Sequence, residues 1–528
     1  LGESALDASV SGGNNTAIGK NALTALTSGA SNVALGSEAL DANTTASGNT
    51  ALGTSTLGTN TTGANNTAVG QGSLFANQTA ANNVGVGYFA LNANTTGHGN
   101  TAVGKSCLDE NETGLYNVAI GQDSLGKNTT ANNNTSVGSF AMEDNTTGAT
   151  NVACGYFALG NNTTANNNVA VGYNSLSTNT TGAANVALGA EALKSNTTAD
   201  FNNAVGYQAL ENNTTGTLND AFGYVALNDN TTGSNNTAIG GGALDSNTEG
   251  NSNVAVGRDT IGVNTTGSQN TAAGRNALGN NTTASDNTAV GYNSLVSNTT
   301  GTENSAVGSL ALQTCTTGSE NCAVGSQALQ TCSTGIRNVA VGRETLHDLT
   351  TGENNTGCGR SAGEQITTGD NNLCLGFNAG RSSSPSGTLT TDNNVVCLGN
   401  NSITSLFCKI STIQTSDIRD KTDITDFKHG LSWITKLRPV TYRWDMRSNY
   451  ENGTPDGSKK EERLHLGFIA QEELEIEKEH GFANDKNDML LANVNADGNY
   501  GMHYDRLVPI LVNAIKELST KVTALEAG

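Results

Sequence analysis

This chain of 528 residues has little charge, few prolines and few aromatic residues. Charged residues make up 14% of the sequence and aromatic residues 5%, and there are only four prolines and two tryptophans. No run of about 18 apolar residues occurs, which excludes a membrane-spanning helix. The net charge of −21 argues against nucleic acid or an anionic membrane surface as a partner, because both are bound through clustered lysine and arginine.

The nine cysteines form neither a CxxC motif nor a cluster with histidine, so we expect no metal site and no cofactor. Two of them, Cys154 and Cys358, occupy an apolar position of the repeat described below, and we expect them to be small core residues. The chain opens at Leu1, inside a repeat and without a signal sequence. We therefore expect an N-terminal anchoring region to precede Leu1.

Charge is concentrated at the end of the chain. Residues 417–528 hold 15 of the 26 lysines and arginines and 20 of the 47 acidic residues, whereas residues 1–416 are rich in Asn, Thr, Gly and Ala. Low complexity of this kind usually indicates disorder. A strict periodicity in the same region indicates instead an ordered repeat.

Every seventeenth residue from Gly2 to Gly376 is a glycine, without an insertion or deletion in the series. With this glycine as position 0, position −1 is apolar, position +4 is almost always leucine, and position −4 is asparagine in every complete repeat. Asn-Thr-Thr-Gly commonly fills positions +7 to +10, as at residues 94–97. A repeat of this length is too short for two helices and a turn, so we expect a β-solenoid whose coil has two short strands and two bends.

Stacking of coils at the interstrand spacing of about 4.8 Å would align equivalent residues in columns. We expect the asparagines at −4 to form an amide ladder, and the residues at −1 and +4 to form a thin core. An insertion would shift every later column out of register, which explains why none occurs. The threonine pairs either present a flat face that orders water or bond to nearby backbone groups in a turn, and we favour the second interpretation.

The stretch from Asn117 to Gly121, Asn-Val-Ala-Ile-Gly, closely matches a motif of a known repeat. Through this motif, the repeats from Leu1 to about Gly376 resemble the head repeats of trimeric autotransporter adhesins. The resemblance implies that the coils belong to a trimer. The repeat length differs from the commonest one in that family, so the handedness of the solenoid stays open.

The repeat pattern fails near Gly376. Glycine replaces leucine at +4 in the last two repeats, and the next matching glycine, Gly399, comes later than the period requires. Residues 381–387 read as a loop between them. We therefore assign residues 1–376 to a solenoid shaft, 377–415 to a cap or neck, and 416–528 to a small α/β domain.

Within that last domain, Asp426 is predicted to cap a helix over residues 427–437, which Arg438-Pro439 ends. We expect a strand over 440–444, a polar loop over 449–462, and a Glu- and Lys-rich helix after residues 466–469.

Two short strands are predicted between residues 489 and 504, followed by a long helix from about Asp505. This helix carries apolar residues at heptad spacing, which suit either a short coiled-coil seam or packing on the domain itself. They are Leu511, Ile515, Leu518, Val522 and Leu525.

Five ordered motifs of this region resemble the intramolecular chaperone auto-processing domain, peptidase S74, found at the C-termini of phage tail spikes and fibres. They are Ser416-Asp417, Lys421 to Ile424, Leu437 to Trp444, Gly467 to Glu472, and Tyr504 to Leu511. The resemblance implies a domain that trimerises, directs folding of the preceding fibre, and cleaves itself between the serine and the aspartate.

The family's catalytic serine and lysine correspond to Ser416 and Lys421, and the cleaved bond would join Ser416 to Asp417. A serine hydroxyl needs a base to become a nucleophile, and a lysine can be that base if burial lowers its pKa. Attack by Ser416 on its own carbonyl would close a four-membered ring, so either the geometry is unusual or another subunit supplies the hydroxyl. We expect at most one such self-cleavage per chain and no activity on other substrates.

These features together predict a homotrimeric extracellular fibre, in first place a phage tail fibre of the virion. Its partner would be a receptor or glycan on the host surface, which the sequence does not identify. A bacterial surface adhesin with the same parts is the alternative, and an ice- or glycan-binding solenoid is a third hypothesis. Neither nucleic-acid binding nor membrane insertion is expected.

Overall fold

A computed structural model describes residues 2–8, 10–405, 418–447, 450, 453–494 and 498–528. The contacts within the chain divide it into two compact units, Leu1–Asn321 and Cys322–Gly528. Each unit is taken by itself below. Among the described residues, no helix combines the length and the apolar character that crossing a membrane requires.

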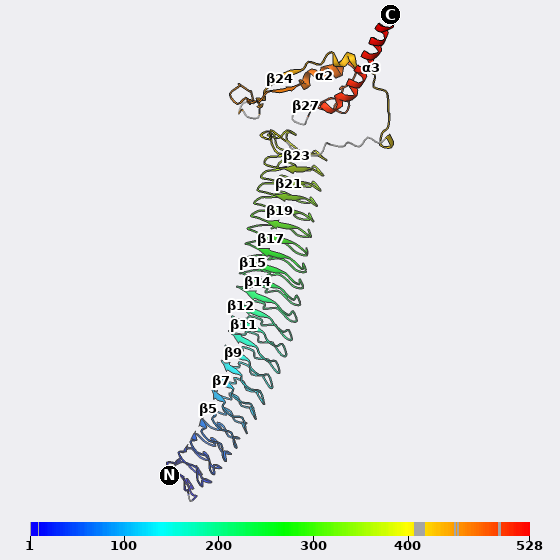
Figure 1. Ribbon diagram of the computed structural model, residues 1–528. Helices are drawn as coiled ribbons and strands as arrows, with labels where there is room; N and C mark the ends of the chain where they lie inside the picture. The colour runs from blue at the N-terminus through cyan, green and yellow to red at the C-terminus, as the bar shows by residue number, and fades with distance from the viewer. Residues whose placement is uncertain (1, 9, 406–417, 448–449, 451–452, 495–497) are drawn as a thin grey trace. The chain divides into compact units, whose positions relative to one another are not determined.

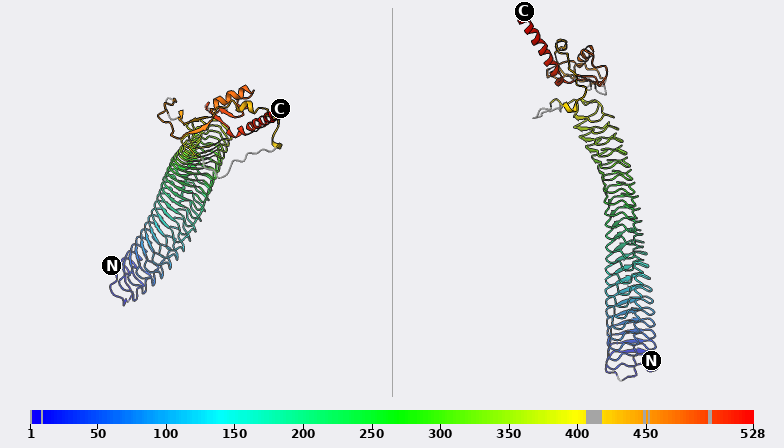
Figure 2. Two further views of the ribbon diagram at one scale, coloured as in Figure 1. Left: turned by 45° about the horizontal axis from the view of Figure 1, so that its top comes forward. Right: turned by 90° about the vertical axis from the view of Figure 1, so that its right-hand side faces the viewer.

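The first unit is a parallel β-solenoid with one three-residue strand in each coil (Figure 1). Each strand pairs with the strand of the next coil, one repeat later, so that Thr16 lies opposite Val33 and Val169 opposite Val186. Both views in Figure 2 follow these coils as a single stack. The strands are β1 (Thr16–Ile18), β2 (Val33–Leu35), β3 (Thr50–Leu52), β4 (Thr67–Val69), β5 (Val84–Val86), β6 (Thr101–Val103), β7 (Val118–Ile120), β8 (Thr135–Val137), β9 (Val152–Cys154), β10 (Val169–Val171), β11 (Val186–Leu188), β12 (Asn203–Val205), β13 (Asp220–Phe222), β14 (Thr237–Ile239), β15 (Val254–Val256), β16 (Thr271–Ala273), β17 (Thr288–Val290) and β18 (Ser305–Val307).

The residues at −1 point out of the solenoid, so the prediction that they form its core is wrong. Ile18 is 49% exposed and Leu188 37% exposed, whereas the alanines at −2 are buried. The reason is the two-residue period of a strand. Because the asparagine at −4 faces inward, position −2 shares its side and position −1 faces the opposite way. Cys154 lies at −1 and is exposed for the same reason, which corrects its assignment to the core.

The predicted second strand is absent from the described coils, and a turn takes its place. In the coil after Gly172, Asn174 at +2 has φ 52° and Leu176 at +4 has φ 51°, both left-handed values that an extended strand does not adopt. Leu176 is nevertheless fully buried, next to the buried Ser175 at +3. The prediction that leucine at +4 belongs to the core is therefore confirmed.

The periodic glycine is required by both conformation and space. Gly172 has φ 135°, and a Cβ atom at this position would lie 2.5 Å from the carbonyl oxygen of Gly189 in the next coil. Only a residue without a side chain tolerates that approach. The glycine period thus marks the point where successive backbones come closest.

The predicted amide ladder at −4 is confirmed. Asn168 is fully buried, and its Oδ1 accepts a hydrogen bond of 2.9 Å from the backbone N–H of Asn185 in the next coil. Its Nδ2 donates a bond of 2.9 Å to the carbonyl of Gly182. Each asparagine of the column therefore accepts from a buried backbone N–H that the narrow core would otherwise leave unpaired.

A second buried column of asparagines, at +7, was not predicted as part of the interior. The Nδ2 of Asn162 donates to Asn145 Oδ1 at 2.7 Å and to the carbonyl of Ala165 at 3.1 Å. At the last asparagine of the column, Asn298, the Oδ1 has no hydrogen-bond partner, because the next repeat places Cys315 there. The threonine that follows, such as Thr163, donates its hydroxyl to the carbonyl of the next coil at 3.1 Å, as favoured above.

The second unit begins with five further coils. Their strands are β19 (Cys322–Val324), β20 (Val339–Val341), β21 (Thr356–Cys358), β22 (Leu373–Leu375) and β23 (Val396–Leu398). Cys358 at −1 is exposed, which again corrects its assignment to the core. The segment assigned to a cap contains one more coil, since Leu373 of β22 pairs with Val396 of β23 across the longer spacing found there.

The remaining elements form a small α/β domain. They are η1 (Ile418–Asp420), α1 (Leu431–Ile434), β24 (Val440–Tyr442), β25 (His465–Gly467), α2 (Ala470–Glu479), β26 (Ala492–Val494), β27 (Tyr500–Met502), η3 (Tyr504–Arg506) and α3 (Leu507–Glu526). The strands pair antiparallel, β24 with β25 and β26 with β27. The predictions of the strand after Pro439, of the Glu-rich helix, of the two later strands and of the long final helix are confirmed.

The prediction of a helix over residues 427–437 is wrong in its start and length, because α1 covers only four residues and begins after Gly430. Tertiary contacts with α3 hold the segment before it. The carbonyl of Phe427 accepts from Asn513 Nδ2 at 2.6 Å, and the N–H of Leu431 donates to Glu517 Oε2 at 3.0 Å. A Cβ at Gly430 would lie 2.5 Å from a backbone nitrogen of α3, so glycine allows this close approach.

Candidate functional site

The residues predicted to cleave the chain lie at the start of the C-terminal domain. Ser416 and Asp417 lie outside the described residues, so their placement relative to Lys421 stays a prediction. Lys421 follows the turn η1, and its backbone N–H donates to the carbonyl of Ile418 at 3.3 Å. The residue is exposed in the single chain, whereas a lysine that acts as a base is usually buried.

Three of the five motifs come together in the fold. The motif from Leu437 to Trp444 contains β24, which pairs with β25 at the start of the motif from Gly467 to Glu472. The same two motifs are joined by an ion pair between Arg438 and Glu472, whose Nε and Oε2 atoms lie 3.1 Å apart. This hydrogen bond and the positive charge of Arg438 lower the pKa of Glu472.

The third motif reaches the other two through Tyr504. Its hydroxyl oxygen accepts a hydrogen bond of 3.0 Å from the N–H of Phe468. A Cβ at Gly467 would lie 2.5 Å from that hydroxyl, so the glycine leaves the space that the tyrosine fills. The sequence motifs therefore describe one packed unit, and their order along the chain reflects contacts in space.

Two glutamates of α2 are buried, and the prediction of a Glu- and Lys-rich helix did not identify them. Glu473 Oε1 accepts from Trp433 Nε1 at 2.8 Å, and its Oε2 has no hydrogen-bond partner. Burial raises the pKa of Glu473 to about 7, although the bond from Trp433 lowers it.

Glu477, one helical turn further along α2, is fully buried as well. Its carboxylate accepts from the backbone N–H groups of Leu490, Leu491 and Ala492 at 2.8, 2.6 and 2.6 Å. The two glutamates are four residues apart and therefore lie on one face of α2, close to Ile476, which is buried. This spacing was the signal in the sequence that could have identified them. Glu477 thus anchors the segment that leads into β26.

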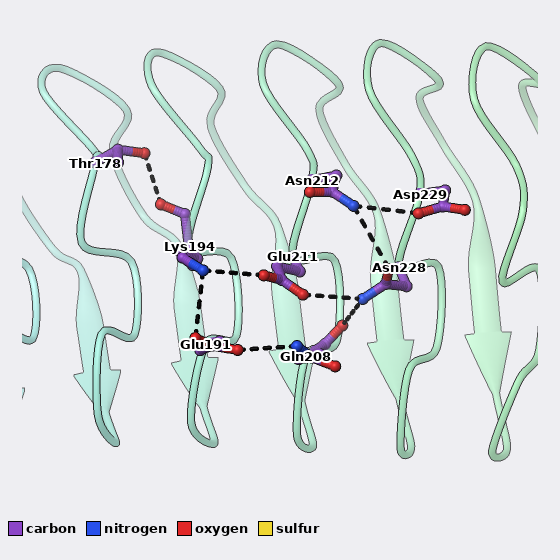
Figure 3. Close-up of polar contacts among 8 residues, drawn as sticks. All are labelled: Thr178, Glu191, Lys194, Gln208, Glu211, Asn212, Asn228 and Asp229. Carbon is purple, nitrogen blue, oxygen red and sulfur yellow. Dashed lines mark hydrogen bonds and ion pairs between the residues drawn. The ribbon is translucent and has the colours of Figure 1, made fainter.

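In the solenoid, a network of polar side chains links four successive coils at positions +2, +5 and +6 (Figure 3). Lys194 Nζ lies 3.3 Å from Glu191 Oε1 and 3.1 Å from Glu211 Oε1 in the next coil. Gln208 donates to Glu191 at 2.9 Å, and this bond together with Lys194 lowers the pKa of Glu191. Asn228 continues the network by donating to Glu211 at 3.4 Å.

The members of this network satisfy one another, so its role is to hold adjacent coils together. The hydrogen bond to Glu211 raises the pKa of Lys194 even though burial opposes its charge. These positions vary from repeat to repeat, so the periodicity of the sequence gives no signal for the network.

Two apolar surfaces of the chain are uncovered. The first is the −1 stripe, which we define as the outward residues at −1 from Ile18 to Leu188 and onward to Val307 in the first unit. The second is the α3 stripe, the heptad residues of α3, where Ile515 is 66% exposed and Leu525 81% exposed. Contiguous apolar surfaces of this kind mark places where another macromolecule binds.

Comparison with known protein families gives one match, in the C-terminal domain. Residues 416–482 match the family described as the chaperone of endosialidase, peptidase S74. No curated protein and no solved structure is similar enough to this chain to count as a match.

The matched segment begins at the serine of the predicted cleavage site and ends three residues after α2. It therefore includes four of the five motifs and the contacts between Arg438 and Glu472. The C-terminal part of this chain is a peptidase S74 domain, a chaperone of the endosialidase type, and it follows a parallel β-solenoid.

Proposed function

We propose that the protein is a homotrimeric extracellular fibre, most simply a phage tail fibre, whose C-terminal domain directs assembly of the solenoid shaft. The observation that carries this proposal is the −1 stripe. A residue type that is apolar in coil after coil and yet points outward leaves much of its apolar surface exposed in a single chain. Its regularity is accounted for if other copies of the same chain cover it.

The number three rests on two resemblances, to trimeric autotransporter heads and to the peptidase S74 domain. A closed three-fold arrangement lets each copy contact two neighbours and leaves no copy with an uncovered stripe. The α3 stripe supports the same assembly at the C-terminus. Its five exposed heptad residues are too few to hold a coiled coil alone, but they add to the contacts of the shaft.

Self-cleavage between Ser416 and Asp417 is part of this proposal. The serine hydroxyl would attack with Lys421 as the base, and the exposed lysine of the single chain would need burial by a neighbouring copy to work at neutral pH. Cleavage would then depend on assembly, so that only assembled chains release their chaperone.

The alternative of a bacterial surface adhesin shares the trimer and the chaperone. An ice-binding face is less favoured, because the first threonine of each pair, such as Thr163, already donates its hydroxyl proton to the next coil. The host and the receptor are left open by this proposal.

Light scattering of the full chain tests the trimer. We expect a mass three times 53.9 kDa at micromolar concentration, and a monomer would refute the proposal. Leu188→Ser, which places a polar residue in the −1 stripe, should weaken the trimer. Ala93→Ser is the matched control, because it lies at +6, outside the −1 stripe, where the chain itself carries serine in Ser195 and Ser246.

Gel electrophoresis tests processing. If the wild-type protein releases the segment from Asp417 to Gly528, then Ser416→Ala and Lys421→Ala should each leave only the full-length band. Release that persists in Ser416→Ala would rule out this residue as the nucleophile.

A further inference from the structure

Two neighbouring coils differ from the other coils at positions −3 and −5, both of which face outward. At position −3 the repeats from Gly19 to Gly376 carry Val, Thr, Ser, Cys or Leu, except at Asn203 and Asp220. At position −5 they carry polar residues or glycine, with four exceptions. Two of these exceptions, Phe201 and Leu218, lie in the same two coils as Asn203 and Asp220. Coincident changes in adjacent coils point to a function at this height of the shaft.

These residues line a hollow on the outer face of the sheet. It has a volume of about 250 Å³ and is formed by Ala184, Phe201, Asn203, Leu218 and Asp220. Phe201 is 58% exposed, so an aromatic wall stands open to the outside.

The floor of the hollow is polar. Asn203 Nδ2 donates to Asp220 Oδ1 at 2.7 Å. Among the described residues no donor contacts the second carboxylate oxygen of Asp220. The hollow therefore suits an occupant with an aromatic or apolar body and a hydrogen-bond donor at its tip.

The same two coils carry side chains with these properties, a pair of tyrosines, at the other end of their strands. Tyr207 and Tyr224, at position +1, follow β12 and β13, whereas Phe201 and Leu218 precede them. The two tyrosine rings are stacked, with centroids 5.8 Å apart and an interplanar angle of 10°. Tyr224 is 64% exposed, so both its ring and its hydroxyl are available.

Within one chain the two sets of residues cannot meet, because the extended strand lies between them. Leu218 and Tyr224 are six residues apart, which corresponds to roughly 15–20 Å along a strand. In a ring of three parallel copies, however, the side of the shaft on which the strands begin in one copy faces the side on which they end in the next copy. Without axial stagger, the hollow and the tyrosine pair lie at the same height.

We infer that the tyrosine pair of one copy docks into the hollow of its neighbour and fixes the register of the three shafts. Phe201 and Leu218 contact the rings, and a tyrosine hydroxyl donates to the free oxygen of Asp220. The inference rests on the proposed trimer and adds to it the residues that select one alignment. Repeats of nearly equal sequence do not otherwise distinguish alignments that differ by a whole number of coils.

One competing alignment is identified by the same reasoning. Tyr156 and Tyr173 form the other stacked pair, with centroids 5.8 Å apart, and lie three coils before the first pair. A slip of three coils would bring them to the hollow. In the correct alignment they face Thr150 and Asn167, which are already bonded to each other at 2.6 Å.

The contact is tested by cross-linking the full-length trimer. Leu218→Cys combined with Tyr224→Cys should give covalent trimers with a short bismaleimide, and peptide mapping should join positions 218 and 224. Neither single variant should give this product above the background of the native cysteines. Leu218→Cys combined with Tyr173→Cys reports the three-coil slip, and efficient joining of positions 218 and 173 would overturn the inference.

The energetic role is tested by subunit exchange between differently labelled trimers. Tyr207→Ser with Tyr224→Ser should speed exchange at least tenfold, and serine is safe for folding because the chain carries it at +1 in Ser37, Ser139, Ser309 and Ser326. Tyr156→Ser with Tyr173→Ser is the matched control and should leave the rate unchanged.

Three results would overturn the inference while leaving the trimer intact by light scattering. They are unchanged exchange in the first double variant, failure of positions 218 and 224 to cross-link, and full reactivity of a cysteine at position 218 toward a bulky thiol reagent. The last result would mean that the hollow faces solvent and is open to a ligand. A monomer by light scattering would instead overturn the proposed trimer, and the inference with it.

Discussion

The asparagine at −4 is the residue of the coil whose replacement should be most damaging, and Asn168→Ala is a clean test. The substitution removes the bond from the Asn185 N–H to Asn168 Oδ1 and the bond from Asn168 Nδ2 to the Gly182 carbonyl, both 2.9 Å long. The buried N–H of Asn185 then loses its partner, whereas the Gly182 carbonyl keeps the bond of 2.9 Å from Asn179 Nδ2.

A buried group left without a partner costs about 1–3 kcal/mol, so the variant should lose about 1–3 kcal/mol per chain. A water molecule that entered the vacated space would recover part of the loss, which sets the lower end. If three chains unfold together, the cost counts three times for each trimer.

Urea unfolding followed by far-ultraviolet circular dichroism measures the loss in the free energy of unfolding. Hydrogen exchange shows which backbone amides lose protection. The amide of Asn185 should exchange much faster in the variant, while amides several coils away should not change. Asn161→Ala is the matched control, because Asn161 lies at +6, where the chain itself carries alanine in Ala25, Ala42, Ala76 and Ala93.

The control should change stability by less than about 0.5 kcal/mol, as surface substitutions usually do. If Asn168→Ala behaved like the control in both measurements, the amide ladder would not be what holds the coils together.

Further predictions concern the C-terminal domain and the assembly. Because burial raises the pKa of Glu473 from 4.5 to about 7, the folded domain favours its protonated form. That stabilisation is complete below about pH 4.5 and is lost as the pH rises through about 7, a loss on the order of 3 kcal/mol. Glu473→Gln should therefore flatten the pH dependence of unfolding between pH 5 and 8, and Glu475→Gln should not. Tryptophan fluorescence reports this domain alone, since both tryptophans, Trp433 and Trp444, lie in it. Leu518→Lys on the α3 stripe should weaken trimerisation in light scattering while leaving the helix content unchanged, and an unaltered trimer would exclude the stripe from the interface. Mild oxidation should join Cys154 of one copy to Cys154 of another, because both lie on the −1 stripe at one height, and a mixed Cys154–Cys358 product would indicate misaligned shafts. A chain that ends at Thr415 should give aggregated or misaligned shafts on folding, and soluble, correctly aligned trimers from it would refute the chaperone role.

The sequence by itself determined the features that repeat or that form short local signals. The glycine period specified the length of one coil, and the invariant asparagine at −4 specified an amide ladder, because only stacked coils place such residues in contact. The ordered motifs from Ser416 to Leu511 identified the C-terminal domain, and the apolar heptad spacing identified α3. These conclusions needed no knowledge of which way any side chain faces.

Tertiary structure decided the direction of side chains and the partners of polar groups. Apolar character at −1 suggested a core residue, but the inward asparagine at −4 and the two-residue period of the strand turned −1 outward. The same surface is thus available for assembly. The Asn-Thr-Thr-Gly motif read as a polar turn, yet its asparagine is interior, because only the stacked coil shows that the next asparagine lies within hydrogen-bond distance.

In the C-terminal domain, local propensity favoured a helix from Phe427, but contacts with Asn513 and Glu517 of α3 hold that segment in another conformation. Glu473 and Glu477 looked solvated until Trp433 and the backbone before β26 were found beside them. In each case the deciding partner lies between 13 and 86 residues away in the sequence. Periodicity reveals contacts that recur at a fixed distance along the chain, whereas contacts made once, between distant segments, are fixed only when the chain is folded.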